Sequence, residues 1–185
     1  KTDQERLQNL TSYFTRHKGT PFEETLKLDG SSMTCFKVVV PHGWFKQRIL
    51  IDLFKFNIAP NTTFGVCSRN LQLRKPGKDD PTSDFWKVAI EQNIEKALPA
   101  GYAIQGELIG PRIQNNHEKV TKLDYYVFDV YDIKNSKYLL PQQRMRFVKE
   151  HLEPYGIKHV PVLGYVTVFH ENKDIASMLD RVKGE

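Results

Sequence analysis

Residues 25–32, with the sequence TLKLDGSS, decide how the rest of the chain is interpreted. They join two runs rich in β-forming residues. The Asp-Gly dipeptide is typical of a tight hairpin turn, because Gly30 tolerates a positive φ without a Cβ clash. We therefore expect residues 22–29 and 32–40 to form a β-hairpin with Lys27 at the root of its turn. Taken alone, a Lys-x-Asp-Gly match also fits a solvated lysine beside a turn, so the context must decide.

The length and composition are those of a folded globular protein. The 185 residues suffice for one domain with a sizeable core, and we expect a single domain over residues 1–185. No apolar run approaches the roughly 18 residues of a membrane span, and the polar N-terminus lacks the apolar segment of a signal peptide. We therefore expect a cytoplasmic monomer with no membrane partner.

The charge and the cysteines narrow the class of protein further. The net charge of +5 permits a polyanionic partner but does not require one. Cys35 and Cys67 lie far apart in β-like runs, with no CxxC motif and no Cys/His cluster. We expect both thiols to be reduced and partly buried, as in an intracellular protein.

The order of the remaining elements predicts the fold class. Extended runs are expected at 49–54, 62–68, 102–109, 122–133 and 159–169. Helices are expected within the first 14 residues, over 83–98, from Pro141 onward and over 174–182. Strands with tight turns, interrupted by helices at irregular intervals, predict an α+β fold of antiparallel sheets flanked by helices.

Three features follow Lys27 in a fixed order. Ser68, Arg69 and Asn70 end a strand, residues 105–110 (QGELIG) place Glu107 on one face of a strand, and residues 126–131 (YVFDVY) place Phe128 in the middle of the next. With this order the chain resembles the covalent nucleotidyltransferases. Within them it is most similar to the ATP-dependent RNA ligases of the RNA ligase 2 type and related phage or bacterial ligases. The stretches GPRIQN (110–115) and VPVL (160–163) add to the resemblance, which covers nearly the whole chain.

The resemblance implies a nucleotidyltransferase (adenylation) domain and a role for each residue of this set. Lys27 would be the nucleophile that takes AMP from ATP as a lysyl phosphoramidate. Arg69 would contact the nucleotide or the 5′-phosphate of the nucleic acid. Glu107 would hold the ribose hydroxyls, and Phe128 would stack on adenine. Taken singly, Arg69 could be a surface ion-pair partner, Glu107 a solvent-facing strand residue and Phe128 a core residue.

The residues around Lys27 complete the implied nucleotide site. Thr25 and Leu26 would line it directly, while Asp29, Gly30 and Ser32 would support it. These ligases often carry glutamate where this chain has Leu26, and some relatives carry asparagine in place of Ser32. In the family, the position of Ser32 touches the nucleotide or the metal.

The resemblance also implies the cofactors, the partners and the reaction. ATP and Mg²⁺, or Mn²⁺, would be used to activate a 5′-phosphate with AMP and to seal it to a 3′-hydroxyl, in RNA or at a nick in a duplex. No metal-ligand cluster is visible, which fits a magnesium ion held by water, phosphate and one or two carboxylates. The likeness to phage ligases is compatible with a phage-encoded protein.

Two further interpretations stay open at the level of sequence. One is a related enzyme, either a DNA ligase or a capping-type guanylyltransferase. The other is a module that binds nucleotide or nucleic acid and has lost the chemistry. The family's later motifs, a Glu-Gly strand and a strand with two lysines, have no counterpart before Glu185. We therefore expect either a fragment of a longer ligase, or strands supplied from elsewhere, and poor self-adenylation by these residues alone.

Overall fold

The computed structural model describes residues 16–41 and 61–167, together with Asn9, Ser12, Asp174, Ala176, Ser177 and Asp180. The run predicted at 49–54 lies outside the described residues, as do most of the helices predicted within the first 14 residues and over 174–182. The chain forms two compact units, residues 1–27 with 160–185 and residues 28–159. The expectation of one adenylation domain over the whole chain stays a prediction.

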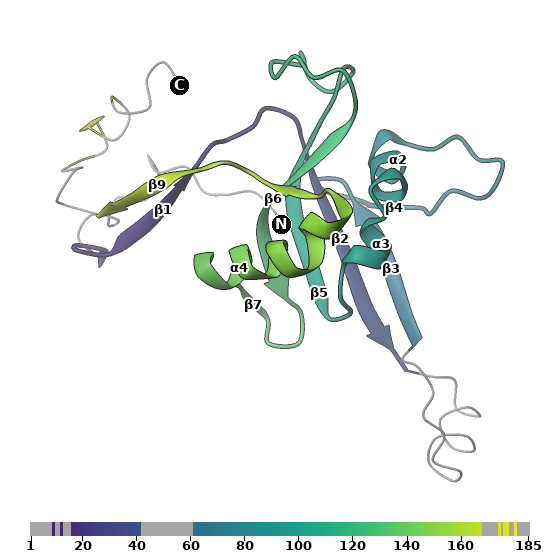
Figure 1. Cartoon of the computed structure of the whole chain (residues 1–185), viewed down its shortest axis with the longest axis horizontal. Coiled ribbons are helices and arrows are strands. Elements are labelled where there is room, and N and C mark those ends of the chain that lie inside the picture. Colours follow the sequence, from purple (N-terminus) through teal and green to yellow (C-terminus); the bar gives the residue numbers. More distant parts are fainter. Residues whose placement is uncertain are drawn as a thin grey trace, which may run out of the picture. The chain divides into compact units, whose positions relative to one another are not determined.

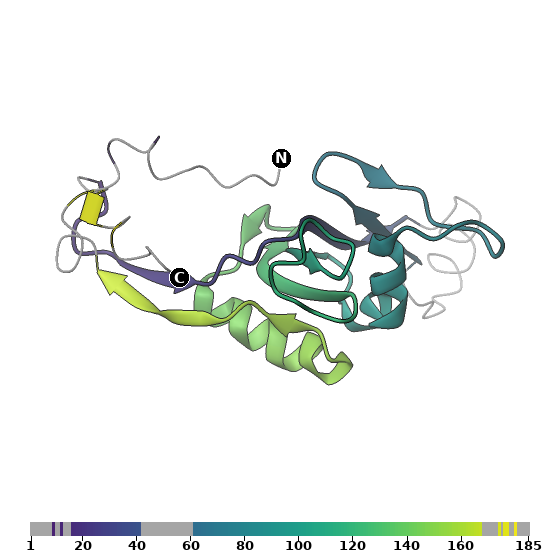
Figure 2. The same cartoon turned by 90° about the horizontal axis from the view of Figure 1, so that it is seen from above.

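The first unit contains a two-stranded antiparallel sheet of β1 (Pro21–Thr25) and β9 (Val162–Thr167). The two strands run side by side in Figures 1 and 2. The register shifts between Glu24 and Thr25, and the Tyr165 hydroxyl donates to Glu23 Oε2 at 3.2 Å. The predicted hairpin is wrong, because β1 pairs with a strand from the far end of the chain rather than with the strand that follows it.

The second unit contains a seven-stranded sheet with the order β4-β3-β2-β5-β6-β7, and β8 also pairs with β6 (Figure 1). Its strands are β2 (Ser31–Val40), β3 (Asn61–Cys67), β4 (Gln72–Leu73), β5 (Tyr102–Ile109), β6 (Asp124–Asp132), β7 (Lys137–Tyr138) and β8 (Lys158–His159). Neighbouring strands are antiparallel, except that β8 runs parallel to β6. The predicted α+β class with antiparallel sheets is confirmed.

The helices of this unit are short. They are α2 (Asp84–Glu91), α3 (Ile94–Ala97) and α4 (Pro141–Phe147), which continues as a π-helical segment, Val148–Leu152. Ser83 caps α2, since its Oγ accepts a hydrogen bond from the Trp86 amide at 3.4 Å. The single helix predicted over 83–98 is wrong. Asn93 takes a left-handed backbone with a φ of 53°, which asparagine tolerates and which ends one helix before the next begins.

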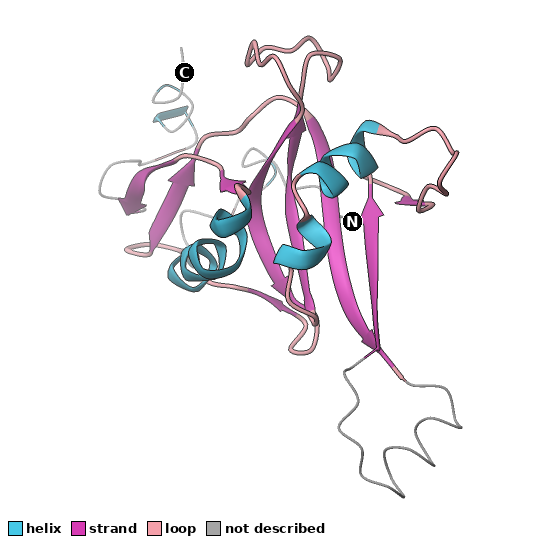
Figure 3. Cartoon of the chain, turned by 45° about the vertical axis from the view of Figure 1, so that its right-hand side comes forward, coloured by secondary structure: helices cyan, strands magenta, loops and turns pink. Residues whose placement is uncertain are grey.

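The core lies between one face of the sheet and the helices. Figure 3 shows α2, α3 and α4 over the sheet. Buried apolar side chains fill this layer, among them Met33, Cys35, Val66, Ile104, Leu108, Val127 and Val130 from the strands, and Trp86, Val88, Ile94, Leu98, Phe147 and Leu152 from the helical segments. Tyr125 is fully buried there and donates its hydroxyl to the carbonyls of Met33 and Ile104 at 3.1 and 3.2 Å.

The predictions about the cysteines and about a membrane span can be compared with the described part of the chain. Cys35 and Cys67 are both free, as predicted, and burial raises the pKa of each thiol. Within the part of the chain that the structure describes, no helix is both long and apolar enough to cross a membrane.

Gly106 gives a direct test of the packing of β5 against β6. A Cβ at this position would lie 2.3 Å from the Tyr126 carbonyl oxygen and 2.7 Å from the Tyr125 ring. We expect Gly106→Ala to lower the free energy of unfolding by roughly 1–3 kcal/mol, measured by urea denaturation, since the strands must separate to admit the methyl group. Gly77→Ala is the control, because its Cβ would approach only the Asp80 carboxyl group, at 3.2 Å. Equal stabilities of the two variants would contradict this packing.

Candidate functional site

The face of the sheet away from the core carries polar side chains at one end. Residues directly opposite each other in an antiparallel pair share a face. Ser32 lies opposite Glu107, and Glu107 lies in turn opposite Tyr126. The start of β2, the end of β5 and the start of β6 therefore meet at this end, and their side chains form what we call the polar face.

The Asp-Gly turn is docked against β5 at this end of the sheet. The Gly30 amide donates to Glu107 Oε1 at 3.1 Å. A Cβ on Gly30 would lie 2.3 Å from the Leu108 carbonyl oxygen and 2.9 Å from Ile109 Cγ2. The tolerance of Gly30 for a positive φ is not used here, because Gly30 is not among the glycines with positive φ. Glycine is needed there for close approach to β5.

Phe128 is the extra residue of a β-bulge. Gln105 pairs with Asp129 and Gly106 with Val127, so Phe128 has no residue opposite it on β5. Val127 and Val130 on either side of it are buried in the core, whereas Phe128 and Asp129 are half-buried. The bulge therefore turns two successive side chains, Phe128 and Asp129, toward the polar face. Phe128 is not a member of the buried core cluster formed by the described residues.

Arg69 lies at the same end of the sheet. It is exposed in the turn between β3 and β4, where the Ser68 amide donates to the Leu71 carbonyl at 2.9 Å. Cys67, the last residue of β3, pairs with Thr34 near the start of β2. The sheet thus brings Gly30, Ser32, Arg69 and Glu107 to one end, and Phe128 follows on the same face in the middle of β6.

The residues on the N-terminal side of the turn belong to the first unit. Thr25 ends β1 opposite Val162, the Leu26 amide donates to the Pro161 carbonyl at 2.9 Å, and Lys27 is exposed. Leu28, the next residue, is buried in the second unit at 7% exposure. Thr25, Leu26 and Lys27 are therefore not part of the group that the seven-stranded sheet brings together, although they are joined to it by the chain.

Sequence reasoning missed two basic side chains beside this group. His117 Nε2 lies 3.5 Å from the Asp29 carboxylate, and both side chains are exposed. Lys158, on the two-residue strand β8, donates to Asp124 Oδ2 at 2.9 Å and to the Tyr126 hydroxyl at 3.3 Å. Its hydrogen bond to Asp124 raises the pKa of the Lys158 ammonium, so Lys158 stays charged beside Tyr126. A strand of two residues has no alternation that a sequence pattern could detect.

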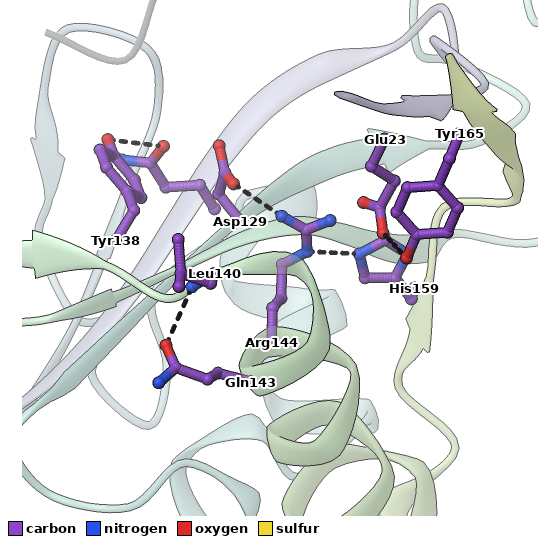
Figure 4. A network of polar contacts seen from close by, with 9 residues as sticks. Glu23, Asp129, Tyr138, Leu140, Gln143, Arg144, His159 and Tyr165 are labelled. Atoms are coloured by element: carbon purple, nitrogen blue, oxygen red, sulfur yellow. Dashed lines mark hydrogen bonds and ion pairs between the residues drawn. The ribbon is translucent and has the colours of Figure 1, made fainter. Parts of the chain in front are cut away.

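A third missed residue is Arg144, on α4, which contacts Asp129 of the bulge (Figure 4). It is buried at 7% exposure, donates from Nε to His159 Nε2 at 2.9 Å and from Nη1 to Asp129 Oδ1 at 3.4 Å. In the sequence it has the spacing of an ordinary exposed residue at the start of a helix. Its partners become neighbours only when the sheet forms.

The described residues hold no group of three or more His, Cys, Asp or Glu side chains that could bind a metal ion. The exposed carboxylate of Asp29 and the half-buried one of Glu107 are two of the oxygen donors on this part of the sheet. Such a donor set fits an ion like magnesium, which keeps several waters and takes only one or two carboxylates beside substrate phosphates.

Comparison with known proteins identifies the family of the chain. The family model described as RNA ligase matches residues 20–185. No curated protein matches the chain. Among solved structures, a mutant of the Naegleria gruberi RNA ligase with ATP and Mn matches at a TM-score of 0.71 and 36% identity over 92% of this chain. The same ligase with pyrophosphate gives the same three values, and a further mutant with AMP and Mn gives a TM-score of 0.72 at 36% identity over 92% of this chain.

The fold is that of the nucleotidyltransferase domain of an RNA ligase. The chain belongs to the RNA ligase family, since the family model covers most of its residues. It spans 44% of the length of the Naegleria gruberi ligase chains that it matches.

The placement of Phe128 can be tested by its effect on stability. Phe147, on α4, is in the core at 6% exposure and serves as the matched control. We expect Phe147→Ala to cost roughly 3–5 kcal/mol of the free energy of unfolding, as for a buried phenylalanine, and Phe128→Ala to cost roughly 1 kcal/mol. Urea unfolding of both variants measures this difference. A larger loss from Phe128→Ala would place its ring in the core instead.

Proposed function

We propose that this protein is an ATP-dependent RNA ligase that forms a lysyl-AMP intermediate on Lys27. The observation that carries the proposal is the contact of Gly30 with Glu107, with Phe128 on the same face of the sheet, in a chain of the RNA ligase family. Structures of the Naegleria gruberi relative contain ATP, the reactant of adenylation, and pyrophosphate, its leaving group, as well as AMP and Mn.

Each residue has a role that its position supports. The half-buried ring of Phe128 would stack on adenine, and Glu107, already fixed by the Gly30 amide at 3.1 Å, would accept hydrogen bonds from the ribose. Thr25, Leu26 and Ser32 would line the nucleotide, and the exposed Arg69 would bind the triphosphate or the 5′-phosphate of the RNA. Lys27 precedes Gly30 by three residues, which span at most about 11 Å, so the chain keeps it within reach of this end of the sheet.

The first chemical step would be an in-line displacement at phosphorus. The Lys27 amine acts as a nucleophile only after it has lost its proton. Its nitrogen lone pair then bonds to the α-phosphorus of ATP, and the bond from phosphorus to the bridging oxygen breaks, so that the electron pair leaves with pyrophosphate. Arg69 would offset the charge that develops on the leaving group.

The next two steps would consume the activated AMP. An oxygen of the RNA 5′-phosphate attacks the AMP phosphorus, the phosphorus–nitrogen bond breaks and the Lys27 amine is restored. A 3′-hydroxyl then attacks the activated 5′-phosphate, loses its proton, and expels AMP as the phosphodiester forms. Asp29 and Glu107 are the carboxylates available to a magnesium ion, which when bound would neutralise phosphate charge.

The substrate that we propose is RNA, as free ends or at a nick, with a 5′-phosphate and a 3′-hydroxyl. The net charge of +5 favours such a polyanion. We also propose that the protein is a monomer in the cytoplasm, where the free thiols of Cys35 and Cys67 would stay reduced.

The covalent intermediate can be detected directly. Incubation with ATP and magnesium should add one AMP to the peptide that contains Lys27, with the acid lability of a phosphoramidate. Lys27→Ala should abolish the label, whereas Lys78→Ala, in the exposed loop before α2, should retain it. Mass spectrometry of the digested protein locates the adduct. Label that persists in Lys27→Ala would show that another residue is the nucleophile.

The base platform is tested by nucleotide binding. We expect Phe128→Ala to weaken ATP binding by roughly 1–3 kcal/mol, the contribution of one base stack, as measured by calorimetry. Phe128→Leu should recover part of this loss, because leucine keeps apolar contact with the base. Binding of pyrophosphate, which has no base, should not change. An unchanged ATP affinity in Phe128→Ala would remove the ring from the site.

A further inference from the structure

The outer edge of β6 is covered at its two ends but not in the middle. β8 pairs with Tyr126 and Val127, whereas β7 pairs with Tyr131 and Asp132. Within the described sheet, no strand therefore pairs with Phe128 or Asp129 on this side. The bulge lies in this interval, so the stretch that carries Phe128 lacks the ladder of hydrogen bonds that would fix a strand on both sides.

The Arg144 guanidinium occupies this interval (Figure 4). It reaches from α4 to Asp129 Oδ1, 3.4 Å from Nη1, on the bulge itself, and to His159 Nε2, 2.9 Å from Nε, on β8. Val127, on the other side of the bulge, pairs with His159. Arg144 thus holds the chain on both sides of Phe128, through Asp129 after it and through the β8 partner of Val127 before it.

The elements around Arg144 are themselves held by side-chain hydrogen bonds. Gln143 Oε1 accepts from the Leu140 amide at 3.1 Å, which closes the first turn of α4. On the adjoining strand β7, the Tyr138 hydroxyl donates to the buried Gln105 Oε1 at 3.3 Å, and Gln105 pairs with Asp129. A buried guanidinium is unfavourable unless its N–H groups have acceptors. The acceptors on Asp129 and His159 therefore hold the Arg144 side chain in one position.

We propose that Arg144 is a positioning residue that sets the ring of Phe128 for the adenine of ATP. This inference rests on the proposed function, because it requires Phe128 to be the base platform. Arginine suits the task since its planar guanidinium donates in two fixed directions, to a carboxylate and to an imidazole at once. A lysine in its place would keep the charge but could not hold both partners with the same geometry.

A double-mutant cycle tests this proposal. The variants are Arg144→Met, Phe128→Ala and the two combined, and the ligands are ATP and inorganic pyrophosphate, both measured by calorimetry. Arg144→Met should weaken ATP binding about fivefold or more, up to the effect of losing the ring, while pyrophosphate affinity stays within about twofold. In the Phe128→Ala background, Arg144→Met should add little, because the two act through the same contact.

Two further variants separate positioning from a general loss of structure. Arg146→Met, on the exposed side of the same helix, should leave the affinity for ATP unchanged. Asp129→Asn keeps the shape of the side chain but weakens the contact with Arg144, and should reproduce the selective loss of ATP affinity even if Arg144→Met does not fold. Arg144→Lys should recover part of the ATP affinity that Arg144→Met loses.

The outcomes distinguish the two levels of the proposal. If Phe128→Ala weakens ATP binding while Arg144→Met and Asp129→Asn bind ATP as the unmodified protein does, the positioning role is wrong and the proposed function stands. Equal losses of ATP and pyrophosphate affinity in Arg144→Met, or fully additive losses in the double mutant, would likewise overturn it. If Phe128→Ala leaves ATP affinity intact, the inference and the assignment of Phe128 both fall.

Discussion

The pairing of β5 with β6 is the constraint on which the rest of the second unit depends. β5 lies between β2 and β6, so its register fixes which side chains face the core and which face away from it. Gly106 permits the approach of the Tyr126 carbonyl, and the register shift beside it makes Phe128 a bulge residue. A one-residue change in this register would exchange the core and the polar face.

The candidate site follows from that register. Antiparallel order brings the start of β2, the end of β3, the end of β5 and the start of β6 to one end of the sheet, with the Asp-Gly turn docked on Glu107. Lys27 precedes Gly30 by three residues in the chain, and its role as the nucleophile remains part of the proposal.

Sequence patterns were sufficient to locate β5 and β6, because the composition and alternation of a strand are local properties. Local patterns failed where the partner is distant: Asp-Gly suggests a hairpin, but Pro21 pairs with Thr167, and no turn signal encodes that contact. The break at Asn93 was missed because the apolar period continues across it. The bulge and its contact with Arg144 could not be predicted, since they depend on the relative register of three elements. The roles of Lys27, Arg69, Glu107 and Phe128 came from the family resemblance and stay predictions.

The most direct measurement is a crystal structure of the protein with ATP and Mn²⁺, in the Lys27→Met variant so that the nucleotide is not consumed. We expect the adenine to lie against the ring of Phe128 and the ribose hydroxyls to donate to Glu107, with the α-phosphate turned toward residue 27. The Arg144 contacts with Asp129 and His159 should be present in the same crystal. A nucleotide bound elsewhere, with Phe128 and Glu107 out of contact with it, would contradict the proposed site.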